Sequence, residues 1–209
     1  MGMQTRPLTK ADYDQIVQVI DRWWGGPTSA LAHPMFFYEL GRLAGFQGRY
    51  ADARGLLEES LTLFRELGLE PWIAATLNRL GYLAFTVGDL PAAREILEES
   101  FAIARCTSDR PVVAEVLVNR GLCAHFGGSL DVARTSYEEA LAIYQRLADR
   151  QEVAMAIHLL GHVVAMQGDA GAARRLYSEG LMTAREAGNR RRLAPGPSHY
   201  RSGAQSSEE

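Results

Sequence analysis

The chain has 209 residues, of which 47% are hydrophobic, with 22 Lys and Arg against 25 Asp and Glu and a formal net charge of −3. This composition is typical of a folded globular protein and excludes a wholly disordered chain, and the charge argues against nucleic acid as a partner. Two cysteines are too few for a disulfide framework. No apolar run approaches the roughly 18 residues of a membrane span, and residues 1–7 lack the apolar core of a signal peptide. We therefore expect a soluble cytoplasmic protein without a membrane partner.

The first 33 residues differ from the rest of the chain and are predicted to form an N-terminal cap. Thr9 begins a pattern similar to a capping box, and residues 11–24 have the apolar spacing of an amphipathic helix. With Trp23-Trp24-Gly25-Gly26 and Phe36-Phe37, residues 5–38 resemble the opening of a GNAT-type acetyltransferase. That family needs a loop that holds pyrophosphate after a strand, and the nearest match, residues 42–47, fails at its last position. We interpret the segment as a fragment without catalytic or cofactor-binding parts that packs over the first repeat; a fusion or a misjoined reading frame would also produce it.

From residue 34 to residue 188 the sequence repeats with a period of 40. The columns that recur in every unit are Gly41, Gly81, Gly121 and Gly161; Gly48, Gly88, Gly128 and Gly168; and Ala53, Ala93, Ala133 and Ala173, each followed by Arg. These columns hold without an insertion. They predict four structural units, at about residues 34–70, 71–110, 111–150 and 151–188.

Each unit is predicted to contain two helices, as the second unit shows most clearly. Residues 73–87 have apolar side chains on one helical face, Gly88 then breaks the helix, and residues 90–106 form the next one. Asp89 is expected to accept free backbone amides at the start of this second helix, and Ser129 and Asp169 stand at the same position, which Arg49 occupies in the first unit. No segment shows sustained alternation of period two, so no sheet is expected.

The small residues of the repeat are expected where the two helices of a unit cross. Gly and Ala allow two backbones to approach to the short end of the usual 8–10 Å range. We expect the larger side chains of the intervening column to fill the gap toward the next unit; they are Leu57, Leu97, Tyr137 and Tyr177. A single hairpin cannot bury its apolar face alone, so the four units are predicted to stack.

The order of large and small residues resembles the tetratricopeptide repeat. In the second unit the pattern reads Leu77, Leu80-Gly81, Ala84, Ala93, Leu97 and Ser100. The period is 40 residues rather than the family's usual 34, and this longer form resembles the repeats of large bacterial regulators. A HEAT-like repeat also tolerates 40 residues, but it does not explain the Gly and Ala columns. The resemblance implies an all-α, right-handed superhelical solenoid of about four helix hairpins with an N-terminal helical cap.

The same resemblance implies a peptide-binding groove on the first helix of each unit. The family's groove positions correspond here to Tyr38, Arg42, Phe46, Asn78, Tyr82, Phe85, Val118, Asn119, Leu122, His125, Met155, His158, His162 and Met166. Aromatic side chains would bury area against a peptide, and amides would bond its backbone. Ordinary packing between units is the alternative for several of these residues.

Two of the groove positions, His158 and His162, have the spacing of two zinc ligands on a helix face, with His125 as a third candidate. No Glu follows the first His, and neither Cys106 nor Cys123 is clearly placed to help, so we interpret these as groove histidines; a groove sensitive to pH is a further hypothesis. Motifs for nucleophilic catalysis or phosphate binding are missing. We expect neither an enzyme nor a bound cofactor or metal.

Residues 189–209 are polar and are predicted to be disordered. No capping helix follows the last unit, so the outer face formed by Leu176, Leu181 and Ala184 is expected to be bare, which favours a homodimer through this unit. The predicted function is therefore non-catalytic binding of a protein or peptide in a regulatory or scaffold role. The alternatives are a remnant or partner-completed acetyltransferase and an oligomerising structural module.

Overall fold

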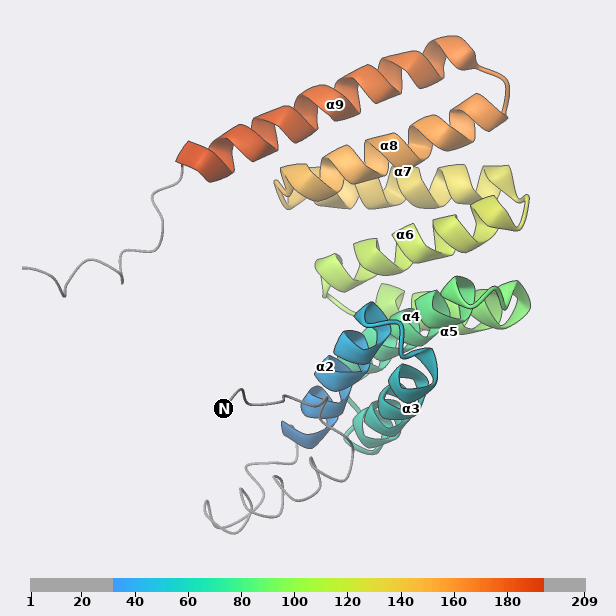
Figure 1. Ribbon diagram of the computed structural model, residues 1–209, viewed down its shortest axis with the longest axis vertical. Coiled ribbons are helices and arrows are strands. Elements are labelled where there is room, and N and C mark those ends of the chain that lie inside the picture. Colours follow the sequence, from blue (N-terminus) through green and yellow to red (C-terminus); the bar gives the residue numbers. More distant parts are fainter. Residues whose placement is uncertain (1–31, 194–209) are drawn as a thin grey trace, which may run out of the picture. The chain divides into compact units, whose positions relative to one another are not determined.

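The computed structural model describes residues 32–193, and over this range the chain is built from helices joined by short turns (Figure 1). The helices are α2 (Ala32–Phe46), α3 (Tyr50–Glu66), α4 (Glu70–Thr86), α5 (Leu90–Cys106), α6 (Arg110–Phe126), α7 (Leu130–Arg146), α8 (Arg150–Met166) and α9 (Ala170–Leu193). The predicted all-α class of consecutive helix hairpins is confirmed. The chain divides into two compact units inside α6, after Cys123, and we describe each unit by itself.

The N-terminal unit has a core formed by α2, α3 and α4. Leu57, Leu61 and Phe64 of α3 belong to one buried cluster with apolar side chains of α2 and α4. Trp72 closes this core, because its ring is stacked on Phe64 at 5.3 Å and meets the ring of Tyr38 edge-on at 5.7 Å. The apolar face of one hairpin is thus buried by the helix that follows it, as the physics of a repeat protein requires.

A repeated contact between a glycine and a large side chain brings the two helices of a hairpin together. A Cβ atom at Gly81 would lie 2.6 Å from Cγ of Leu97, and one at Gly41 would lie 2.7 Å from Cγ of Leu57. The large side chains therefore lie across the glycine of their own hairpin. Leu57 also belongs to a buried cluster with Leu77 and Leu80 of α4, and Leu97 to one with Cys123 of α6. Both side chains therefore fill space toward the next unit, as expected, in addition to their contact with the glycine.

Two buried serines align the two helices within each of these hairpins. The hydroxyl of Ser60 donates to the carbonyl oxygen of Pro34 over 2.7 Å, and that of Ser100 donates to the carbonyl oxygen of Ala74 over 2.8 Å. Both serines are fully buried, so each hydroxyl has its hydrogen bond inside the hairpin, as a buried polar group must. The second helix is thereby tied to the first turns of the helix before it.

The turns inside the hairpins are made by the predicted glycines. Gly48, Gly88, Gly128 and Gly168 all have positive φ, between 75° and 93°, the left-handed conformation in which glycine commonly ends a helix. Asp89 caps α5 as expected, since its carboxylate accepts from the amide of Ala92, and Asp169 caps α9 in the same way. Ser129 makes no side-chain cap, and α4 begins at Glu70, before the predicted residue 73.

The C-terminal unit comprises the end of α6 and helices α7, α8 and α9. A Cβ atom at Gly161 of α8 would lie 2.8 Å from the ring of Tyr177, so this aromatic also lies across the glycine of its own hairpin. Gly180 takes the place of the buried serines, and a Cβ there would lie 3.4 Å from the carbonyl oxygen of Ala154. Helix α9 continues to Leu193, although residues from 189 onward were predicted to be disordered.

Several predictions concern residues outside the described range. The N-terminal cap and most of the acetyltransferase-like segment, at residues 1–31, and the tail at residues 194–209 lie there. The last part of residues 5–38 forms the first turns of α2. In the part of the chain that the structure describes, no helix is both long and apolar enough to cross a bilayer.

Candidate functional site

The predicted groove residues of the N-terminal unit divide into exposed and buried sets. Phe46 is 78% exposed and Tyr82 is 44% exposed, so both are accessible to a partner. Asn78 and Val118 are 1% and 6% exposed, and Tyr38 is also buried. The half-buried positions are Arg42, Phe85, Asn119 and Leu122. The accessible part of the predicted groove therefore lies at the C-terminal ends of α2 and α4.

The buried positions form polar contacts within the unit. Nδ2 of Asn119 donates to Oδ1 of Asn78 over 2.9 Å, which links α6 to α4. Nε of Arg79 points to the hydroxyl of Tyr38 at 3.4 Å, and its Nη2 forms an ion pair of 3.0 Å with Glu115. These side chains satisfy one another, so they align neighbouring helices and leave ligand contact to the exposed positions.

A cavity of about 240 Å³ opens beside the exposed set, between α2, α3 and α4. Its lining is formed by Gly41, Arg42, Gly45, Phe46, Tyr50, Ala53, Leu57, Arg79, Tyr82, Leu83 and Thr86. Arg42, Phe46 and Tyr82 were predicted as groove residues. The sequence reasoning missed Tyr50, although an aromatic at the start of the second helix is visible in the first unit, where the later units have Leu90, Leu130 and Ala170.

Arg42 supplies the cavity with a cationic group that is only partly satisfied. Its Nη1 forms an ion pair of 2.8 Å with Glu39, and its guanidinium carbon lies 5.9 Å from the centre of the Tyr38 ring. Its Nε is buried and has no hydrogen-bond partner. The rest of this guanidinium is only half-buried, so its Nη groups can donate to an incoming acceptor, such as a carbonyl or carboxylate oxygen.

The groove positions of the C-terminal unit form a cluster of His and Met side chains. Met155, His158, His162 and Met166 are exposed along α8, and His125 is half-buried at the end of α6. Nε2 of His158 lies 3.2 Å from Nε2 of His162, and Nε2 of His125 lies 3.0 Å from Sδ of Met166. Burial, with a contribution from His162, lowers the pKa of His125 from its ordinary value, which favours its neutral form.

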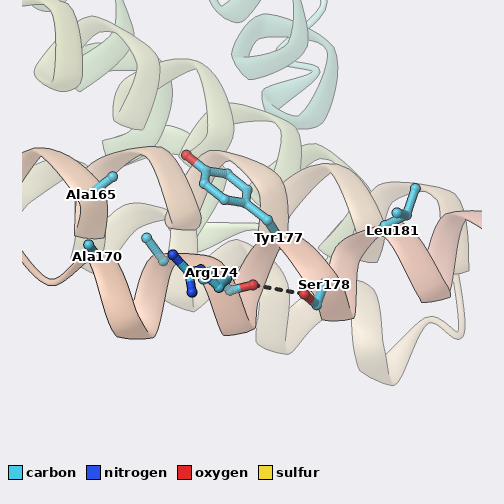
Figure 2. Close-up of a pocket in the computed structure, with 7 residues that line it drawn as sticks. Ala165, Ala170, Arg174, Tyr177, Ser178 and Leu181 are labelled. Carbon is cyan, nitrogen blue, oxygen red and sulfur yellow. Dashed lines mark hydrogen bonds between the residues drawn. The ribbon is translucent and has the colours of Figure 1, made fainter.

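A second hollow lies beside α8 and α9, and Figure 2 shows the side chains that line it. A hollow of about 430 Å³ is lined by Ala165, Ala170, Ala173, Arg174, Tyr177, Ser178 and Leu181. Leu181 and Met182 are 52% and 62% exposed. Leu61, which stands in the repeat column of Leu181, is only 7% exposed because it packs into the core that α4 completes.

The described side chains contain no group of three or more His, Cys, Asp or Glu that converge as metal ligands. Adjacent glutamates recur with the repeat as Glu58-Glu59, Glu98-Glu99 and Glu138-Glu139, and they are surface groups rather than an acid/base pair. Glu58 and Glu138 form ion pairs with Arg54 and Arg134 one helical turn away. Burial raises the pKa of the Cys123 thiol above its ordinary value, which disfavours the reactive thiolate.

Consecutive antiparallel helix pairs, held together by recurring Gly, Ala and Ser contacts, define a helical-repeat protein of the protein-interaction class. A family model for the tetratricopeptide repeat matches residues 35–105 and 112–186, which is more than half of the chain. The chain therefore belongs to the tetratricopeptide repeat family, as its repeat columns predicted. A search of curated proteins found no match.

Three solved structures with the same fold illustrate the likeness. The crystal structure of BtubC (BKLC) from P. vanneervenii has a TM-score of 0.67 at 23% identity, covering 84% of this chain and 70% of that one. A Rap protein complexed with competence and sporulation factor has a TM-score of 0.69 at 17% identity, covering 77% of this chain and 45% of that one. The crystal structure of MamA has a TM-score of 0.57 at 19% identity, covering 86% of this chain and 93% of that one. These likenesses show the fold alone, and this chain spans less than half the length of the Rap protein.

Proposed function

We propose that this chain is a non-catalytic module that binds a peptide segment of another protein, and that the cavity between α2, α3 and α4 is the centre of the binding site. Tetratricopeptide repeats are typically protein-binding modules, and the cavity is the observation that carries the proposal. It has exposed aromatic groups at its mouth and one incompletely bonded cation, Arg42, in its wall. The fold of the Rap protein that was solved with competence and sporulation factor supports the same kind of role.

The lining of the cavity indicates which peptide it would accept. Gly41, Gly45, Ala53 and Leu57 form an apolar floor, over which Phe46, Tyr50 and Tyr82 offer aromatic area. A bulky apolar side chain would bury its surface there, at about 25 cal/mol per Å². The half-buried guanidinium of Arg42 would donate through its Nη groups to a backbone carbonyl or an acidic side chain beside it. The preferred ligand is therefore a segment that combines a large apolar residue with a neighbouring acceptor.

The test is a peptide selection followed by measurements on matched variants. Peptides selected by display against the full chain are titrated by fluorescence anisotropy into the wild type, Phe46→Ala and Tyr82→Ala. Aromatic residues at the centre of an interface commonly contribute about 2 kcal/mol or more, so we expect each variant to weaken binding by at least roughly tenfold. Both side chains are exposed, so their loss should leave the fold unchanged.

The matched control is Phe126→Ala. Phe126 occupies the repeat column of Phe46 and is 64% exposed, but it does not line the cavity. Its removal is expected to leave peptide affinity unchanged. Equal losses for Phe46→Ala and Phe126→Ala, or no loss for either cavity variant, would show that the cavity is not the binding site.

A second candidate function is self-association through the outer side of α9. The observation in its favour is that Leu181 is exposed where Leu61, in the equivalent column, is covered by the next helix of the array. Light scattering should then show a mass that rises with protein concentration in the wild type, and Leu181→Lys should lower it. A mass that stays at one chain up to high concentration would remove this candidate.

A further inference from the structure

The cavity between α2, α3 and α4 lies beside a repeat column that has no side chain in the first hairpin. The residues of this column are Gly45, Phe85, His125 and Ala165. Gly45 has no positive φ, and an added Cβ would meet the nearest described atom outside its own helix, the Cβ of Ala53, only at 3.9 Å. At Gly41, by contrast, an added Cβ would lie 2.7 Å from Cγ of Leu57. Neither the backbone nor close packing therefore requires glycine at position 45, although glycine lowers the stability of a helix.

The second hairpin shows what occupies the equivalent space when this column has a large side chain. Phe85 is half-buried and packs against a buried cluster. The members of that cluster are Ala93, Leu97 and Cys123. The residues 40 positions earlier are Ala53, Leu57 and Leu83, and all three line the cavity of the first hairpin. The ring of Phe85 therefore takes, in its own hairpin, the place that the cavity has in the first.

A small residue in this column coincides with an open space in the C-terminal unit as well. Ala165 lines the hollow beside α8 and α9, together with Ala173 and Tyr177 (Figure 2). Those two residues stand in the columns of Ala53 and Leu57. Both hairpins whose column residue has no atom beyond Cβ thus have a hollow at this position, so the size of the column residue determines whether the space is filled.

The lining of the first cavity favours a ring over an aliphatic group. Phe46, Tyr50 and Tyr82 all contribute to it. Aromatic pairs in edge or offset contact are more stable than the area they bury would give. An aromatic ligand group would gain these contacts with the three rings, whereas a leucine side chain would gain only the burial of its surface.

The charged groups of the lining restrict the residues that can flank such a ring. Arg42 and Arg79 line the cavity, whereas their ion-pair partners, Glu39 and Glu115, are not lining residues. A peptide with a neutral or acidic residue beside its aromatic group would complement these two cations, and one with a lysine or arginine there would be repelled.

We propose that the partner's peptide inserts a phenylalanine side chain into this cavity, in the place that Phe85 takes in its own hairpin, and that Gly45 is the residue that determines this specificity. The inference rests on the proposed peptide-binding function and names the anchor residue of the ligand. A side chain at position 45 would fill the space from within the chain, and its absence lets a ring enter from the partner.

The first test uses N-acetyl-L-phenylalaninamide as the probe, titrated into the isotope-labelled full chain and followed by NMR. The amide resonances of Gly41, Gly45 and Ala53 should shift and reach saturation. N-acetyl-L-leucinamide should bind about 2- to 10-fold more weakly, because it lacks the contacts between rings. Equal affinity for the two compounds, or no shift at these three amides, would overturn the proposal.

The key variant is Gly45→Phe, which gives the first hairpin the column residue of the second. It should keep the helix content of the wild type by circular dichroism and weaken probe binding by at least roughly tenfold, as expected when an anchor loses its pocket. Gly45→Ala is the matched control, because its Cβ makes an ordinary contact with Ala53 and leaves most of the space open. It should bind the probe like the wild type. Undiminished binding by a folded Gly45→Phe chain would contradict the assigned role of Gly45.

The reciprocal variant, Phe85→Ala, keeps the proposal testable if Gly45→Phe does not fold. Removal of the ring should open the equivalent space in the second hairpin, and apolar cavities take up aromatic molecules. The probe should then shift the amide resonance of Gly81 in Phe85→Ala but not in the wild type. No new shift at Gly81 would show that the column residue does not control access to this space.

The peptides selected by display separate this inference from the proposed function. Their aromatic anchor, replaced by leucine, should weaken binding to the wild type. If Phe46→Ala and Tyr82→Ala weaken peptide binding while Gly45→Phe does not, the cavity remains the binding site and the phenylalanine anchor is wrong. If none of the three variants changes peptide affinity, the proposed function and this inference both fail.

Discussion

Asn119 donates a hydrogen bond of 2.9 Å to Asn78, an amide that is only 1% exposed. The contact joins helices from two successive hairpins of the N-terminal unit, so the amide pair specifies how these hairpins align. Asn78→Ala would remove this bond, and because the Asn119 amide is only half-buried we expect the loss to be that of one hydrogen bond, about 0.5–1.5 kcal/mol. Urea unfolding should show this loss for Asn78→Ala. A double-mutant cycle with Asn119→Ala should show coupling between the two positions; additive effects would contradict the assigned role.

The glycine that faces Leu97 should not tolerate a side chain. A Cβ at Gly81 would lie 2.6 Å from Cγ of Leu97, and overpacking of this kind costs typically 1–3 kcal/mol. Gly55→Ala is the matched control, because Gly55 is an exposed glycine inside α3 with nothing within 4 Å of an added Cβ. There, alanine should stabilise by about 0.5–1 kcal/mol through its helix propensity. Thermal unfolding should therefore shift in opposite directions for the two variants.

Two residues at the same repeat position should differ in their contribution to stability. The Asp89 carboxylate accepts a hydrogen bond from the amide of Ala92, whereas Ser129 makes no side-chain bond to the start of α7. Asp89→Ala is expected to lower the free energy of unfolding by about 1 kcal/mol, the usual contribution of a cap. Ser129→Ala should change it much less. Similar losses for both variants would indicate that sequence position rather than the hydrogen bond matters.

The two cysteines should react at very different rates. Cys106 is exposed, while Cys123 is 5% exposed and burial raises the pKa of its thiol. Since the thiolate is the reactive species, iodoacetamide at neutral pH should label Cys106 first and Cys123 slowly. Mass spectrometry of the native protein over time gives both rates. Labelling of Cys123 as fast as that of Cys106 would contradict its burial.

Acidification should destabilise the C-terminal unit through His125. The pKa of His125 in the folded chain lies below its ordinary value of 6.5, so the unfolded chain binds a proton that the folded chain does not. The free energy of unfolding therefore falls as the pH decreases below about 6.5. Urea unfolding at pH 7 and pH 5 should show a larger loss for the wild type than for His125→Gln. Equal losses would show that other groups control the pH dependence.

The sequence predicted the repeat, the helices and the turn glycines because these depend on periodicity and on local backbone preferences. Residues 90–106 coincide with α5, and every glycine of the 48/88/128/168 column has positive φ. The predicted start of helix α4, residue 73, lies after the observed one, because Leu69 offers no side-chain cap that would reveal where the helix begins.

The groove could be predicted only in part, because a helical pattern shows which face is apolar but not which neighbour covers it. Asn78 was assigned to the groove, yet its burial depends on Asn119, 41 residues away. Tyr50 was missed because it belongs to the second helix of its unit and enters the cavity only through the turn of the hairpin. The contacts of Leu57 with Gly41 and of Leu97 with Gly81 were likewise not predicted, because they depend on how the two helices of one hairpin are positioned.

The serine bonds of the first two hairpins join residues 26 apart, and the amide bond between hairpins joins residues 41 apart. Short separations of this kind give a low contact order, which favours rapid folding that can start in any hairpin. Local opening of one hairpin then leaves distant ones intact. Backbone amides in the middle of α4, which packs between α3 and α5, should accordingly exchange with solvent more slowly than those of α9. The outer side of α9 has no helix against it in the described chain.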